Sequence, residues 1–146
     1  MTIDSMQQLR GYLLANGDTS KIDVLFAEPT RWNFEDLQYF TKVKELYITN
    51  AYFEPNQEAF IDKFLNDGFE WDRLELLSLH ECELKKIPEF IFKNKTIKYL
   101  ILTSNKITEV DERIKQLTHI EHIDISGNKI SGEEVQKLLP SCYVEY

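Results

Sequence analysis

A pattern of apolar residues that recurs every 23 residues in the second half of this chain constrains its fold more than any other feature. The segments LELLSLHECEL, IKYLILTSNKI and IEHIDISGNKI begin at Leu74, Ile97 and Ile120. Each has aliphatic residues at its first, fourth, sixth and eleventh positions and Cys or Asn at its ninth. A constant period means that one structural unit is repeated and that neighbouring units stack to bury a continuous core.

Two weaker copies precede these three. VKELYITNAYF begins at Val43 and IDVLFAEPTRW begins at Ile22, and both keep the apolar positions while losing the Asn or Cys. We therefore expect a single domain over residues 1–146, with five repeats at 22–130. An N-terminal cap at 1–21 and a C-terminal cap at 131–146 seal the two ends of the stack, as terminal units of repeat proteins do.

Alternation within each segment predicts a strand with two different faces. Leu77 and Leu79 point one way, and Leu76 and Ser78 point the other. Stacked copies form a parallel sheet whose inner face is the core, so that Leu77, Leu100 and Ile123 lie on adjacent strands. The amide at the ninth position, as in Asn105, bonds the backbone groups of the turn that leaves the strand, and a Cys there does the same more weakly.

The pattern L-x-x-L-x-L-x-x-N/C-x-L resembles that of the leucine-rich repeat family. The ending LPSCYVEY, which follows an expected helix, is similar to the ends of short bacterial proteins of that family. The resemblance covers about residues 22–146. It implies a right-handed α/β solenoid with a curved parallel sheet and an N-terminal capping helix, and it implies that the concave face of the sheet is the usual binding surface.

The segments outside the strands predict short helices and turns. A capping box at 4–7 predicts a helix to about residue 16, and a second box at 131–134 predicts another helix followed by an edge strand. Pro88 opens a helical turn, and we expect further helices over 33–40 and within 54–68. The apolar residues expected to lie against the first repeat are Ile3, Met6, Leu9 and Leu13.

The residues that alternate with the core positions are the candidate binding residues. Six of them are apolar on a face that should meet water: Val24, Phe26, Tyr47, Leu76, Tyr99 and Ile101. A contiguous set of this kind with a polar rim is typical of a protein-binding site. The predicted partner-binding residues are Phe26, Glu45, Tyr47, Leu76, His80, Tyr99, Ile101, His122 and Asp124.

Within that set, Tyr47, Leu76 and Tyr99 are the expected central anchors, because binding energy concentrates in aromatic residues at the middle of a patch. Glu45, Glu81 and Asp124 are expected to select the charge of the partner. The opposing interpretation is that strands favour Tyr, Ile, Val and Phe for their β-propensity alone.

Charge disfavours nucleic acid as a partner. There are 25 acidic and 17 basic residues, a net charge of −8, and the lysines at 85, 86, 93, 95 and 98 are scattered among acids. We therefore expect a neutral or basic protein partner. The apolar runs are too short to cross a membrane, and no basic start precedes an apolar stretch, so we expect a cytoplasmic protein that does not contact membranes.

No pattern in the sequence predicts catalysis, a metal or a cofactor. Cys82 and Cys142 belong to strands about 14 Å apart, too far for a disulfide, and are expected to be buried free thiols. His80, His119 and His122 lack metal-ligand spacing, and there is no G-x-S-x-G elbow and no phosphate-binding glycine loop. We predict no catalytic residues, no metal ligands and no cofactor.

The sequence thus favours a non-catalytic protein-interaction module that binds through the concave face, as a monomer or a weak homodimer. An alternative is an inhibitor or immunity-type protein that blocks an enzyme such as a basic nuclease, since the acidic charge would suit that target. An enzyme is the third and least favoured class.

Overall fold

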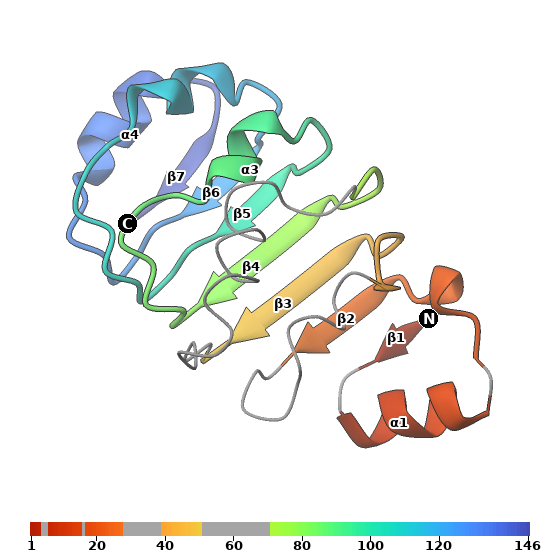
Figure 1. Ribbon diagram of the computed structural model, residues 1–146. Coiled ribbons are helices and arrows are strands. Elements are labelled where there is room, and N and C mark those ends of the chain that lie inside the picture. The colour runs from red at the N-terminus through yellow and green to blue at the C-terminus, as the bar shows by residue number, and fades with distance from the viewer. Residues whose placement is uncertain (4–5, 16, 28–38, 51–70) are drawn as a thin grey trace.

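The strands of successive repeats lie side by side in one sheet, as Figure 1 shows. The computed structural model describes residues 1–3, 6–15, 17–27, 39–50 and 71–146. Within these residues seven strands follow one another in chain order, and every neighbouring pair is parallel. They are β1 (Thr2–Ile3), β2 (Val24–Ala27), β3 (Glu45–Thr49), β4 (Leu76–His80), β5 (Tyr99–Ile101), β6 (His122–Asp124) and β7 (Tyr143–Glu145).

The fourth position of each repeat forms a continuous aliphatic ladder through the sheet. Leu77 pairs with Leu100, and Leu100 pairs with Ile123. All three side chains have no exposed surface. Their placement on adjacent strands was predicted from the 23-residue period and is confirmed, so the α/β leucine-rich-type solenoid expected from the sequence is the observed fold.

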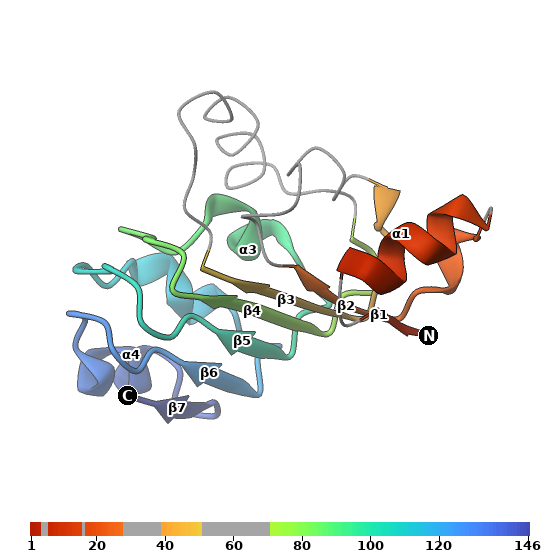
Figure 2. The ribbon, with the colours of Figure 1, turned by 90° about the horizontal axis from the view of Figure 1, so that it is seen from below.

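Short helices connect the strands. They are α1 (Met6–Leu14), η1 (Thr19–Lys21), α3 (Glu89–Lys93), η5 (Glu112–Gln116) and α4 (Gly132–Leu138). All of them except η1 carry apolar residues that are buried against the core. Helix α1 lies beside the β1 end and α4 beside the β7 end (Figures 1 and 2). As predicted, α3 begins directly after Pro88, and it buries Phe90, Ile91 and Phe92.

The predicted helix and edge strand at the C-terminal end are confirmed. The Ser131 hydroxyl accepts a hydrogen bond from the Glu134 amide at 3.3 Å and caps α4. Strand β7 then pairs in parallel with β6. Cys142 precedes β7, and it and Cys82 are buried free thiols, as expected from their separation in the stack.

The N-terminal end differs from the prediction. Residues 2–3 form a strand that pairs with β2, which the sequence did not predict because two residues are too few to show a period. Ile3 and Leu9 are buried as expected, but Leu13 is 44% exposed and its predicted packing is wrong. Because β1 occupies the place next to the first repeat, α1 covers less of the sheet than expected.

Several predicted features lie outside the described residues. They are the capping box at residues 4–5, the end of the first helix at residue 16, the side chain of Met6, and the helices expected over 33–38 and within 54–68.

Asn105 joins two repeats through its side-chain amide. Its Oδ1 accepts hydrogen bonds from the backbone amides of Cys82 and Leu84 at 2.9 and 3.1 Å. Its Nδ2 donates to the carbonyls of Leu79 and Leu102 at 2.7 and 2.9 Å. Cys82, Leu84 and Leu102 lie past the ends of β4 and β5, and Leu79 lies in β4 beyond the last residue that pairs with β5. Asn105 itself is buried. The predicted role of the ninth position is confirmed.

The same pattern recurs in the adjacent repeats. Asn128 accepts from the Ile107 amide at 3.1 Å and donates to the Leu102 carbonyl at 2.7 Å. The Cys82 thiol approaches the carbonyls of Ile48 and His80 at 3.6 and 3.3 Å. A thiol can donate but is a poor acceptor, so Cys82 fills only half of the role that Asn fills.

Among the described residues, the eighth residue of four repeats adopts a left-handed backbone. Its φ is 55° at Asn50, 52° at Glu81, 56° at Ser104 and 72° at Gly127. The amides of Asn50, Glu81 and Ser104 each donate to a carbonyl in the following repeat, at 2.8–3.1 Å. This conformation costs a residue with a Cβ about 1–2 kcal/mol, so the bonds between repeats must offset local strain.

We predict that Asn105→Leu lowers the free energy of unfolding by about 2–6 kcal/mol, because it leaves the two amides of Cys82 and Leu84 without an acceptor at about 1–3 kcal/mol each. Asn128→Leu should cost less, since Asn128 is only half-buried and accepts one backbone amide. Urea-induced unfolding of the two variants measures the difference. An equal or smaller loss for Asn105→Leu would contradict the account.

A pair of glycine variants tests the left-handed turn. At Gly127 an added Cβ would lie 3.1 Å from the Ser104 backbone at a φ of 72°, so Gly127→Ala should lower the free energy of unfolding by about 1 kcal/mol or more. At Gly11, in α1, a Cβ meets nothing within 4 Å, and Gly11→Ala should raise stability by about 0.5–1 kcal/mol. Thermal unfolding of both proteins should give melting temperatures on opposite sides of the parent value.

Candidate functional site

The side chains that point away from the core form two rows across the strands, which together we call the concave face. The register of the sheet aligns one row from β2 to β7 and a second row two residues further along each strand. The first row is Val24, Glu45, Leu76, Tyr99, His122 and Tyr143; the second is Phe26, Tyr47, Ser78, Ile101, Asp124 and Glu145. His80 lies at the end of β4, beside Thr49, so the structure brings all nine predicted residues to this face.

Aromatic rings gather at the N-terminal end of the face. The rings of Phe26 and Tyr47 are stacked with centroids 4.5 Å apart. The Tyr47 hydroxyl donates to the Glu45 carboxylate at 2.9 Å. Partial burial, together with this hydrogen bond to a negative group, raises the pKa of Tyr47 to about 12. Tyr47 is thus a neutral, oriented aromatic side chain over the whole physiological range.

The centre of the face is apolar but less exposed than the sequence suggests. Leu76, Tyr47 and Ile101 are half-buried, while Phe26 and Tyr99 are each 39% exposed. Strands lie only about 4.8 Å apart, so large neighbouring side chains cover one another.

Ser78 corrects the prediction that its row is open to water. It pairs with Tyr47 on one side and Ile101 on the other, and these larger side chains bury it. The centre of the concave face is therefore a shallow apolar surface without a polar side chain exposed in its middle.

The C-terminal end of the face carries carboxylates. The His122 ring meets the Tyr143 ring edge-on with centroids 5.0 Å apart, and its Nε2 lies 3.4 Å from the Glu145 carboxylate. Asp124 accepts hydrogen bonds from the Ser126 amide and hydroxyl at 2.9 and 2.6 Å. Asp124 and Glu145 are opposite each other on β6 and β7, so this end presents negative charge.

His80 contacts two polar neighbours at the edge of the face. Its Nδ1 lies 2.7 Å from the Thr103 hydroxyl, and its Nε2 lies 3.5 Å from the Glu81 carboxylate. These contacts hold the ring in place. Within the described part of the chain, no group of three or more His, Cys, Asp or Glu side chains is arranged to hold a metal ion.

Tyr143 and Glu145 also belong to this face, although they were not among the predicted residues. Tyr143 is 65% exposed and Glu145 is also exposed, whereas Cys142 and Val144 between them are buried. The alternation in SCYVEY could have shown this, because it places residues 143 and 145 opposite the buried pair.

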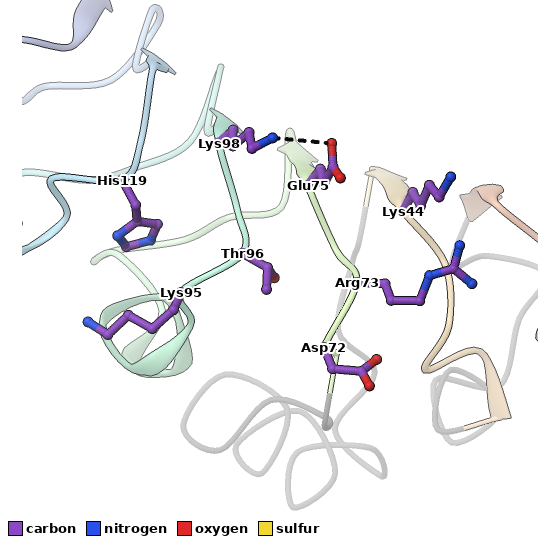
Figure 3. Close-up of a pocket in the computed structure, with 8 residues that line it drawn as sticks. All are labelled: Lys44, Asp72, Arg73, Glu75, Lys95, Thr96, Lys98 and His119. Atoms are coloured by element: carbon purple, nitrogen blue, oxygen red, sulfur yellow. Dashed lines mark ion pairs between the residues drawn. The ribbon is translucent and has the colours of Figure 1, made fainter.

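A second missed feature is a hollow of about 320 Å³ at the turns that enter β3, β4, β5 and β6, which we call the cationic hollow (Figure 3). Its lining residues are Lys44, Asp72, Arg73, Glu75, Lys95, Thr96, Lys98 and His119. Burial and the nearby Lys95 lower the pKa of His119, so its ring is neutral at pH 7. The hollow thus has four cations and two carboxylates.

In the sequence, Lys95 and Lys98 lie scattered among acids and predict no basic surface. The structure corrects this, because stacking brings the entry turns of consecutive repeats together although they lie 23 or more residues apart in sequence. A smaller hollow of about 230 Å³ lies next to it and shares two of its residues; its lining is Lys44, Glu45, Glu75, Leu76 and Tyr99. The second hollow opens onto the apolar centre of the concave face.

Comparisons with known proteins agree with this geometry. The family model described as leucine rich repeat matches residues 72–130. The chain is 36% identical over 63 residues to Receptor-like protein 7 of Arabidopsis thaliana, a match over 42% of this chain and 6% of that protein. The structure of a leucine-rich repeat protein of Leptospira interrogans has a TM-score of 0.59 and 21% identity, covering 99% of this chain and 35% of that one.

Residues 72–130 are leucine-rich repeats, and the chain as a whole has the fold of a leucine-rich repeat protein. It spans only a small part of each relative, so the likeness establishes the repeats and the fold. Leucine-rich repeat domains are in general modules for protein–protein interaction, and their extended concave surfaces are the usual place of binding. None of the helices in the described ranges has the length and apolar character needed to span a membrane.

The Tyr47 hydroxyl provides a pH test of this site. Its folded pKa of about 12 exceeds the ordinary value of 10.0. The contacts of the Tyr47 hydroxyl therefore contribute fully to the free energy of unfolding below pH 10. This contribution is lost as the pH rises from about 10 to 12, because Tyr47 ionises at a lower pH in the unfolded chain than in the folded protein. Ultraviolet titrations of the parent protein and Tyr47→Phe should differ by one tyrosine that ionises near pH 12.

Glu45→Gln separates the causes of that shift. It removes the negative acceptor but keeps the surrounding burial, so the pKa of Tyr47 should fall and stay above 10. Ionisation of every tyrosine near pH 10 in the parent protein would show that Tyr47 is neither buried nor bonded as described.

Proposed function

We propose that this leucine-rich repeat protein is a non-catalytic interaction module that binds a protein partner through its concave face. The observation that carries the proposal is the continuous apolar and aromatic surface formed by Phe26, Tyr47, Leu76, Tyr99 and Ile101 on four neighbouring strands. Single exposed apolar residues need no explanation, but a contiguous set with a polar rim is typical of a binding surface.

The energetics suit a moderate affinity. Fully burying a side chain of this size contributes about 1.5–3 kcal/mol, and the half-buried residues here would contribute less. Association costs about 4–15 kcal/mol, so five or six such contacts support micromolar rather than picomolar binding. Tyr47 and Tyr99 would act as anchors, because they combine large area with few rotatable bonds.

Charge supports a neutral or basic partner. Asp124 and Glu145 lie side by side at one end of the face, and the whole chain carries a net charge of −8. A partner with a cation near this end would relieve the repulsion between the two carboxylates. Glu45 and Glu81 would add to this selection. We further propose that the protein acts in the cytoplasm as a monomer or a weak homodimer.

The alternative, an inhibitor or immunity-type protein that blocks an enzyme such as a basic nuclease, rests on the same acidic charge. It would use the same concave face. A tight complex that abolishes the activity of a nuclease would favour the inhibitor, whereas binding without any loss of the partner's activity would favour a general interaction module.

The direct test is affinity capture from the native cell with the parent protein and with Tyr47→Ala/Tyr99→Ala. The double variant should weaken partner binding by about a hundredfold, as expected for two anchors of about 1.4 kcal/mol or more each. Its circular dichroism spectrum should stay that of the parent, because neither side chain belongs to the core.

The matched control is Tyr39→Ala/Tyr146→Ala, which removes two tyrosines that are exposed but lie outside the concave face. It should capture the partner like the parent protein. Equal capture by the parent and the Tyr47→Ala/Tyr99→Ala protein would move the binding site away from this face.

A further inference from the structure

The cations of the cationic hollow have hydrogen-bond donors that the described part of the chain leaves unused. Lys44, Arg73, Lys95 and Lys98 make no side-chain hydrogen bond to any described residue. Their ion pairs are loose: Arg73 lies 3.7 Å and Lys44 lies 4.0 Å from Asp23, and Lys98 lies 3.7 Å from Glu75. Lys95 has no ion pair with a described residue.

Arg113, in contrast, is a cation whose side-chain donors are engaged in hydrogen bonds to neighbouring carboxylates. Its guanidinium donates to both oxygens of Glu89 at 2.5 and 3.0 Å and to Asp111 at 2.6 Å. It also lies over the Phe92 ring at 4.4 Å. Arg73, by contrast, keeps its planar set of donors available, and such a set fits a carboxylate through two parallel hydrogen bonds.

The carboxylates near the hollow are already shared among other cations. Asp72 accepts a hydrogen bond at 2.8 Å from Lys42, which is not part of the lining, and this bond lowers the pKa of Asp72. Asp23 is contacted by Lys44, by Arg73 and, at 2.5 Å, by the amino group of Met1. One carboxylate cannot neutralise three cations, so this edge of the molecule stays locally positive within an acidic chain.

The position of the hollow connects it to the proposed binding face. Lys44 and Glu75 line both the cationic hollow and the smaller hollow that contains Leu76 and Tyr99. Figure 3 shows Lys44 and Arg73 on the same flank of the cationic hollow, with Lys98 and Glu75 at the neighbouring edge. A ligand over Leu76 and Tyr99 is therefore next to these loosely paired cations.

We propose that the cationic hollow binds a carboxylate of an acidic residue in the partner, next to an apolar side chain that lies over Leu76 and Tyr99. This inference rests on the proposed function and adds the chemistry of the bound segment. Arg73 pairs with both carboxylate oxygens, and Lys44 and Lys98 lie on either side. Only a short acidic stretch fits, because the overall negative charge of the chain repels a longer one.

Two blocked dipeptides test this inference: N-acetyl-Phe-Glu-amide and its neutral analogue N-acetyl-Phe-Gln-amide. Each is titrated into nitrogen-15-labelled protein at low salt, and the backbone amide shifts of Arg73, Glu75, Thr96 and Lys98 are followed. The Glu peptide should give saturable shifts in these amides and bind at least about threefold tighter than the Gln peptide. Added salt should reduce the difference, since the contacts are exposed.

Lys44→Gln/Arg73→Gln should remove the preference for the Glu peptide. Lys129→Gln/Lys137→Gln is the control, because it removes the same charge at two exposed positions outside the hollow, and it should keep the preference. Equal binding of the two peptides, no saturable shift, or inorganic phosphate binding as tightly as the Glu peptide would each overturn the inference.

The two proposals can fail separately. If capture of the natural partner depends on Tyr47 and Tyr99 but is unchanged in Lys44→Gln/Arg73→Gln, the concave face still binds and only the acidic contact is excluded. If capture does not depend on the two tyrosines, the proposed function fails first.

Discussion

The stack depends on the hydrogen bonds that Asn105 and Asn128 make between neighbouring repeats. A strand in a parallel sheet is paired on both sides, but the turn that leaves it exposes amides and carbonyls to the core, where each unpaired group is costly. One amide side chain satisfies both kinds of group in two repeats at once. Because the bonds cross from one repeat to the next, they also fix the register that places the aliphatic ladder of Leu77, Leu100 and Ile123.

That register determines the binding surface. Once the ladder is buried, alternation leaves the other side chains of each strand on the concave face, and pairing across strands brings Phe26 beside Tyr47 and Leu76 beside Tyr99. The same stacking brings the entry turns together and creates the cationic hollow from lysines and an arginine of three different repeats. The apolar centre of the concave face, its acidic C-terminal end and the cationic hollow thus all result from the same periodic core.

The sequence predicts this structure best where a residue pattern is periodic. The ladder, the Asn role and the nine face residues follow from spacing, because burial alternates regularly along a repeated strand. The cap at Ser131 follows from a local capping motif. Prediction was poorer where the outcome depends on neighbours from other repeats. Ser78 is buried only because Tyr47 and Ile101 flank it. Lys44 and Arg73 line the same hollow only because the turns that enter β3 and β4 stack on each other. Strand β1 was missed because its two residues are too few to form a pattern.

The most direct measurement of the central claim is amide hydrogen exchange at Cys82, Leu84 and Ile107. These amides lie in turns outside the strands, and their acceptors are the side chains of Asn105 and Asn128. If the asparagines hold the repeats together, the three amides exchange as slowly as those of β4 and β5 and open only with global unfolding. Exchange as fast as in exposed turns would show that the stack is held without them and would contradict the account.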